Sequence, residues 1–84
     1  MVRLVFLGKF GDIAPAELGA VTLPDTVATL SGLRDWLAQQ QPLLAQAMAG
    51  TSTRMVLNQK IVHDLSNPVM DGDEVAFLPP MSGG

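Results

Sequence analysis

The chain has 84 residues, 48% of them apolar and 15% charged, which is the size and composition of one small folded domain rather than a disordered segment. It has no cysteine, so disulfides, thiolate catalysis and cysteine-based metal sites are excluded. Its net charge of −3 argues against nucleic-acid binding, and the N-terminal apolar run is too short for a signal core or a membrane span. We therefore expect a cytoplasmic protein whose partners are neither nucleic acids nor membranes.

Two short strands are predicted before the first helix. Residues 2–8, VRLVFLG, are rich in β-branched and aromatic residues and are bounded by a glycine. Residues 20–23, AVTL, form a second short run. Between them Gly11, Pro15 and Gly19 break any long element, so residues 9–19 are expected to form a loop.

The hydrophobic period then changes to that of a helix. Apolar residues from Val27 to Leu37 repeat at intervals of three and four, which places them on one stripe of a helix. Thr29 is a candidate N-cap, and Pro42 prevents the helix from continuing. Residues 42–50, PLLAQAMAG, predict a second, shorter helix.

The last third of the chain returns to strands. Residues 54–62 hold two short apolar runs on either side of the turn-prone pair Asn58-Gln59. A second turn signal, DGD at residues 71–73, precedes a final strand over residues 74–78. This order predicts an α+β fold in which one main helix crosses one face of a mixed sheet.

The alternation of side chains predicts an apolar outer face on this sheet. Arg3 marks the solvent side of the first strand, and Glu74 marks that of the last. The residues that share those sides are Val5, Leu7, Ala76 and Leu78. An uncovered apolar patch usually marks a protein partner. The alternative is that the loop over residues 9–19 folds across it.

Few side chains suggest catalysis or metal binding. His63 and Asp64 are adjacent, so on a strand they face opposite ways and do not form a ready catalytic pair. Asp71 and Asp73 belong to turn chemistry, because Gly72 between them can adopt positive φ. No metal site is predicted.

The end of the sequence, PPMSGG at residues 79–84, carries the remaining candidate. Pro79 and Pro80 keep the base of this segment extended, while Gly83 and Gly84 have no Cβ and can enter a narrow channel. A terminal carboxylate is a poor electrophile until it is activated, for instance as an acyl-adenylate. The alternative is an unstructured, inert tail. We expect a domain over residues 1–78 and a flexible tail over residues 79–84.

The segment DGDEVAFLPPMSGG, residues 71–84, closely resembles the C-terminal signature of the small subunits of molybdopterin synthase, the MoaD family of sulfur carriers. The resemblance extends to VRLVFLGKFGDIA, to LPDTVATLSGLRDWLAQQQP and to VLNQKIV. It implies a β-grasp, ubiquitin-like fold, which agrees with the predicted order of strands and helix.

The resemblance also implies a mechanism. A ubiquitin-activating-type adenylyltransferase would use ATP to convert the carboxylate of Gly84 to an acyl-adenylate, and a sulfur donor protein would supply the sulfur of a thiocarboxylate. The tail would enter the large catalytic subunit of molybdopterin synthase, and sulfur would pass to cyclic pyranopterin monophosphate. No cofactor would be bound permanently. Gly83, which has no Cβ, would give the tail access to the active site of the large subunit. The expected contacts with the large subunit are Val5, Leu7, Ala76, Leu78, Pro79, Pro80, Met81 and Ser82.

Three features depart from the family pattern. Gly11 stands where a long side chain is common, Pro15 replaces a frequent glycine, and Met81-Ser82 replaces the usual small or β-branched pair. Three alternatives stay open: a ThiS-like sulfur carrier for thiazole synthesis, a ubiquitin-like modifier of other proteins, and a plain binding module.

Overall fold

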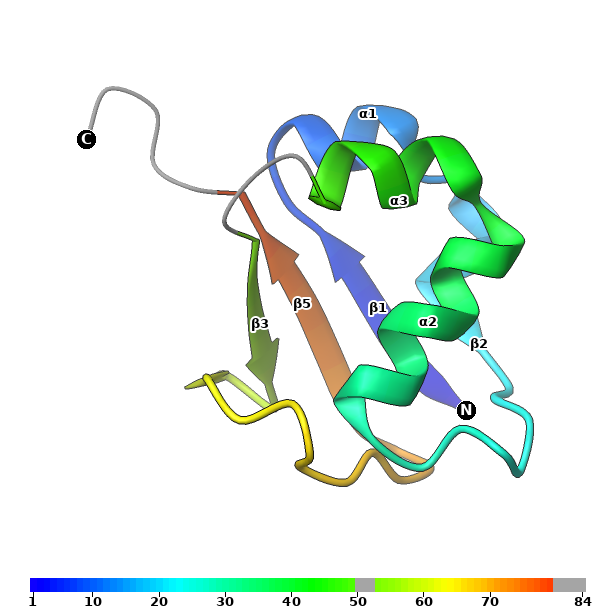
Figure 1. The fold of residues 1–84 in the computed structure, drawn as a ribbon, viewed down its shortest axis with the longest axis vertical. Coiled ribbons are helices and arrows are strands. Elements are labelled where there is room, and N and C mark those ends of the chain that lie inside the picture. Colours follow the sequence, from blue (N-terminus) through cyan, green and yellow to red (C-terminus); the bar gives the residue numbers. More distant parts are fainter. Residues whose placement is uncertain (50–52, 80–84) are drawn as a thin grey trace.

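The computed structural model describes residues 1–49 and 53–79 (Figure 1). Within them the chain forms one five-stranded mixed sheet with the strand order β2-β1-β5-β3-β4. The strands are β1 (Val2–Phe6), β2 (Ala20–Val21), β3 (Arg54–Leu57), β4 (Lys60–Val62) and β5 (Glu74–Leu78). The α+β prediction is therefore confirmed, and the last strand has the predicted bounds.

The two ends of the sequence meet at the centre of the sheet. β1 and β5 are parallel, and β3 is antiparallel to β5 on its other side. β3 and β4 form a hairpin whose two turn residues, Asn58 and Gln59, have φ of 49° and 70°. Positive φ at both central positions is what a type I′ turn requires, and its twist matches that of the strands. The turn prediction at this pair is confirmed.

The helices cover one face of the sheet. Helix α2 (Leu30–Gln40) begins at Thr29, whose hydroxyl oxygen accepts a hydrogen bond from the Gly32 backbone N–H at 3.1 Å. This confirms Thr29 as the N-cap and leaves Val27 outside the helix. The face of α2 toward the sheet is fully buried through Leu30, Leu33 and Leu37. Helix α3 (Pro42–Ala49) follows at once and adds Leu44 and Met48 to the same core.

The segment between β1 and β2 is more ordered than the sequence predicts. It forms a short helix α1 (Lys9–Ile13) and a 3₁₀ helix η1 (Ala16–Gly19). Phe10 and Leu18, one from each, belong to the core cluster, and α1 lies beside α3 (Figure 1). The segment therefore packs on the helix side, and the alternative that it covers the outer face is wrong.

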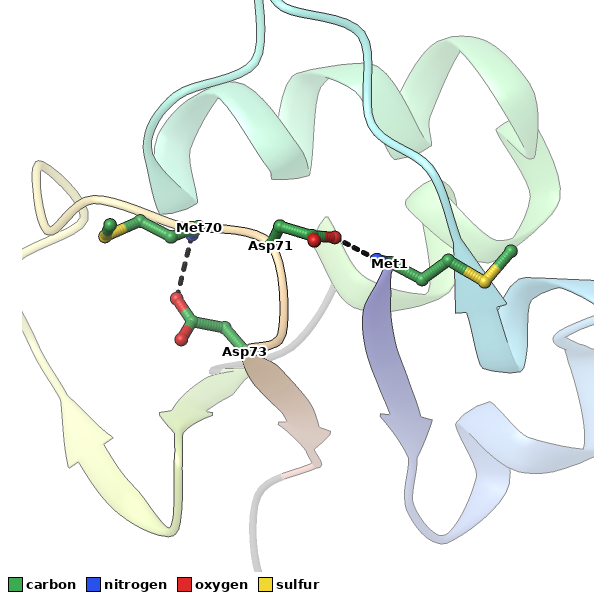
Figure 2. Close-up of polar contacts among 4 residues, drawn as sticks. All are labelled: Met1, Met70, Asp71 and Asp73. Carbon is green, nitrogen blue, oxygen red and sulfur yellow. Dashed lines mark hydrogen bonds and ion pairs between the residues drawn. The ribbon is translucent and has the colours of Figure 1, made fainter.

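The acidic turn before β5 contacts the first residue of the chain (Figure 2). The Asp71 carboxylate forms an ion pair with the amino group of Met1, and Asp73 accepts a hydrogen bond from the Met70 backbone N–H at 2.8 Å. Gly72 has φ of 92°, as predicted, and its N–H donates to the Met1 carbonyl oxygen at 2.9 Å. These carboxylates therefore stabilise the turn.

No helix among the described residues has the length and apolar character needed to cross a membrane. The same residues contain no cluster of three or more His, Asp or Glu side chains arranged to hold a metal ion.

Candidate functional site

The outer face of the sheet carries a continuous apolar row. The core cluster takes Leu4 from β1 and Phe77 from β5, while their neighbours Val5, Ala76 and Leu78 are outside it. The strand register sets one outer residue of each strand side by side across β1, β5, β3 and β4: Val5, Ala76, Val56 and Ile61. The strand register therefore puts Val5, Ala76 and Leu78 on the side predicted from alternation, and the row is longer than the sequence indicated. Ala76 is nevertheless buried, at 9% exposure, and Ile61 is the exposed member of the row.

The row has charged ends and an exposed apolar rim. At the end where β1 and β5 start, Arg3 and Glu74 form an ion pair at 3.6 Å. At the opposite end Arg54 is paired in register with Leu78. Leu7 and Ile61 are 38% and 51% exposed, which is high for large apolar side chains in a small domain.

Two hollows of the surface lie apart from the apolar row. A groove of about 580 Å³ lies on the helix side of the sheet, with Met48, Met55 and Phe77 among its lining residues and Arg34 and His63 at its exposed rim. The apolar residues of the outer row line neither this groove nor the smaller hollow beside Met1.

The last described residues, Leu78 and Pro79, lie at the end of the central strand β5. Leu78 ends β5 on the outer face, and Pro79 follows it beside Gly8. The Leu7 backbone N–H donates to the Phe77 carbonyl oxygen at 3.1 Å, so β1 and β5 stay paired up to this point. The base of the C-terminal segment, Pro79, therefore adjoins the apolar face.

Several predicted site residues lie outside the described residues. They are Pro80, Met81, Ser82, Gly83 and Gly84. The roles predicted for them, the flexible tail and the partner contacts predicted for the outer face remain predictions.

The only histidine does not form a pair with its acidic neighbour. His63 is exposed, and the Asp64 carboxylate instead accepts hydrogen bonds from the hydroxyl and the backbone N–H of Ser66, at 2.6 and 2.9 Å. Because these bonds favour the ionised form, they lower the pKa of Asp64 below its ordinary value. Asp64 and Ser66 therefore form a turn, and His63 and Asp64 do not form a catalytic pair, as predicted.

Four residues at the outer face and the end of β5 were not predicted from the sequence: Gly8, Arg54, Val56 and Ile61. Arg54, Val56 and Ile61 join the outer face only through pairings between β5, β3 and β4, which no local pattern reveals. Gly8 could be recognised in the sequence as the glycine that bounds the first strand. Its contact with Pro79 could not be predicted, because the two residues are far apart in the sequence. At Gly11 an added Cβ would lie 2.8 Å from the Phe6 carbonyl oxygen, so α1 packs closely on the end of β1.

The strand order, the parallel central pair and the crossing helix define a β-grasp domain of the ubiquitin-like class. Solved structures support this class. SAMP1 from Haloferax volcanii has a TM-score of 0.75 at 23% identity, covering 99% of this chain and 98% of that one, which shows a shared fold. A complex of subunits 1 and 2 of molybdopterin-converting factor from Helicobacter pylori gives a TM-score of 0.68 at 26% identity, covering 99% and 97%.

Sequence comparison identifies the family. The ThiS family model matches residues 5–84, and the chain belongs to that family. It is 31% identical to the molybdopterin synthase sulfur carrier subunit of Haemophilus influenzae and 30% identical to that of Escherichia coli, over the full length of both chains in each case. The resemblance to these carriers found in the C-terminal sequence is confirmed.

Proposed function

We propose that this protein is the sulfur carrier subunit of a molybdopterin synthase and that its reactive group is the carboxylate of Gly84. The observation that carries the proposal is the geometry of β5. Its last residue, Leu78, lies in the apolar outer face, and the chain continues from there toward the two terminal glycines. A partner that docks on this face would therefore lie beside Leu78 and Pro79, after which the sequence runs on to Gly84.

The chemistry follows from what a carboxylate can do. An adenylyltransferase of the ubiquitin-activating type joins the Gly84 carboxylate to the AMP part of ATP and releases pyrophosphate. Reduced sulfur from a donor protein then displaces AMP and leaves a thiocarboxylate. The thiocarboxylate sulfur is a good nucleophile that bonds to cyclic pyranopterin monophosphate, and hydrolysis of the resulting thioester returns the Gly84 carboxylate and leaves the sulfur on the acceptor. Two such transfers supply the dithiolene sulfurs of molybdopterin. This chain binds no cofactor permanently in the scheme, and ATP serves the activating enzyme.

The partner in sulfur transfer is the large catalytic subunit of the synthase. The related Helicobacter pylori protein is described as part of a complex of two subunits, which supports a partner of this kind. The outer face suits such a partner because its apolar residues, including Leu7 and Ile61, would leave water on docking. Catalytic side chains are expected in the large subunit, which would receive the C-terminal segment.

The test is the intact mass of the protein after incubation with ATP, the adenylyltransferase and a sulfur donor. We expect the mass to rise by the difference between one sulfur and one oxygen atom, and the product to support molybdopterin formation with the large subunit. Deletion of Gly84 should abolish both while leaving thermal unfolding unchanged.

Gly19→Ala is the control, because an added Cβ there meets nothing within 4 Å. It should leave the mass change intact. If the wild-type mass does not change, or if the thiocarboxylate serves thiazole synthesis but not molybdopterin synthesis, the proposal is wrong. A series of heavier protein adducts would indicate a modifier instead.

A further inference from the structure

We infer that Gly8 is a positioning residue. Because it has no Cβ, it leaves space for the ring of Pro79 and so sets the direction of the chain at Pro79, before the residues that lead to Gly84. The inference rests on the proposed function, because the direction matters only if the Gly84 carboxylate must reach an active site in a docked partner. Gly8 and Pro79 are distant in sequence, and the parallel pairing of β1 with β5 brings them together.

The backbone at Gly8 requires glycine. Its φ of 57° and ψ of −137° fall in a region that side chains with a Cβ rarely adopt. This conformation turns the chain out of β1 and into α1. A Cβ added at Gly8 would also lie 3.0 Å from the Cγ atom of Pro79 and 3.7 Å from its Cδ atom. Real Cβ atoms seldom approach other atoms so closely, so the ring of Pro79 occupies the space that a side chain at Gly8 would need.

Both sides of this contact are held in place. On one side, the Gly11 N–H donates to the Gly8 carbonyl oxygen at 3.0 Å, and the fully buried Phe10 anchors α1 in the core. On the other side, the Leu7 N–H donates to the Phe77 carbonyl oxygen at 3.1 Å, two residues before Pro79. The turn is therefore tied to the core at Gly8, and the strand is held up to Phe77, close to the contact.

The position of the Pro79 ring is passed on to the chain that follows. A proline ring fixes its own φ, and a residue that precedes a proline is restricted to extended ψ. In the sequence Pro79-Pro80, these rules restrict φ and ψ of the first residue and φ of the second. Placing the ring of Pro79 against Gly8 therefore directs the segment that leads to Gly84.

The chain offers a matched control for this idea. Gly72 also has positive φ, at 92°, but an added Cβ there meets nothing within 4 Å. It lies before the start of β5, at the other end of the strand from Pro79. Gly72→Ala therefore imposes strain at positive φ without touching the C-terminal segment, whereas Gly8→Ala does both.

The experiment measures ATP–pyrophosphate exchange by the adenylyltransferase with full-length carrier variants, together with thermal unfolding of each variant. For Gly8→Ala we expect kcat to fall by about tenfold, because the Pro79 ring must give way by a few tenths of an ångström and the reacting carboxylate is redirected, with KM little changed because the outer face is intact. Gly72→Ala should lower the unfolding temperature but leave kcat unchanged. The double variant Gly8→Ala with Pro79→Ala should lose less kcat than the product of the two single losses, because the two residues are in contact and their effects are not additive.

The outcomes distinguish a failure of the positioning role of Gly8 from a failure of the proposed function. If the wild-type chain is active but Gly8→Ala and Gly72→Ala have the same kcat, Gly8 is only structural and the inference is overturned. If the wild-type chain is not adenylated, the proposed function is wrong and the positioning role falls with it. If Gly8→Ala does not fold, Pro79→Ala alone tests the contact. It should lower kcat by several-fold without changing the unfolding temperature, and an unchanged kcat would overturn the inference.

Discussion

The two faces of the sheet are both apolar, but their side chains differ in how deeply they are buried. On the helix side Val75 and Phe77 of β5 are 0% and 1% exposed and belong to the continuous core. On the outer side Leu78 stays half-buried, and Leu7 and Ile61 are more exposed still. The helix side of the sheet therefore forms the core, while the outer side leaves part of its apolar area exposed. Leu7 and Ile61 stay exposed although a domain of this size has little apolar area to spare.

The largest expected effect comes from breaking the covered face. Phe77→Ala removes a ring stacked on Phe6, with centroids 5.0 Å apart and ring planes within 8°. We expect the free energy of unfolding to fall by about 3–5 kcal/mol, measured by urea denaturation. The adjacent change Leu78→Ala, on the outer face, should cost about 1 kcal/mol or less. Equal losses for the two neighbours would contradict the division of the sheet into two faces.

The second effect concerns binding through the outer face. Leu7→Asp places a charge at the rim of this face and should weaken binding to the large subunit by about 2 kcal/mol, measured by titration calorimetry. Leu43→Asp is the control, since Leu43 is 74% exposed on α3, on the helix side of the sheet. It should bind like the wild type. If both variants bind equally well, the outer face is not the docking surface.

A smaller effect is expected where α2 begins to cover the sheet. Thr29→Ala removes the hydroxyl that accepts from the Gly32 N–H and should lower the free energy of unfolding by about 1 kcal/mol. Thr29→Ser keeps the hydroxyl and should stay close to the wild type in the same urea measurement. If serine costs as much as alanine, the methyl group of Thr29 matters and the cap does not.

The smallest effect is a pH dependence at the exposed turn of Asp64 and Ser66. Ser66→Ala removes the hydroxyl that lowers the pKa of Asp64, so that pKa should rise toward its ordinary value in an NMR titration. A lowered native pKa stabilises the fold above the unfolded pKa, and this contribution is lost as pH falls through the native value. The stability difference between wild type and variant should therefore shrink in acid. An unchanged pKa of Asp64 would assign its shift to the backbone N–H of Ser66 alone.

Local patterns predicted most elements of the fold. The spacing of Leu30, Leu33 and Leu37 gave the buried face of α2, and Asn58-Gln59 gave the hairpin turn. The prediction failed for residues 9–19, where Gly11 and Pro15 suggested a loop. There two short helical turns form because Phe10 and Leu18 reach the core, a tertiary gain that outweighs poor local propensity.

The candidate site was predicted only in part. Alternation in β1 and β5 gave the outward placement of Val5 and Ala76, because successive strand residues face opposite ways whatever the strand order. It could not add Val56 or Ile61, since membership of the row depends on which strands are neighbours. The terminal glycines were identified from the sequence and lie outside the described residues.

The sequence by itself determined which side chains each strand turns to the core, where the main helix begins, and that residues 71–84 resemble those of the sulfur carriers. These properties depend on neighbours within a few residues and on a short signature. Only the tertiary structure decided that β1 and β5 lie side by side and parallel. That pairing joins residues about 70 positions apart, creates the apolar row and places Gly8 against Pro79, because long-range contacts depend on the packing of the whole chain.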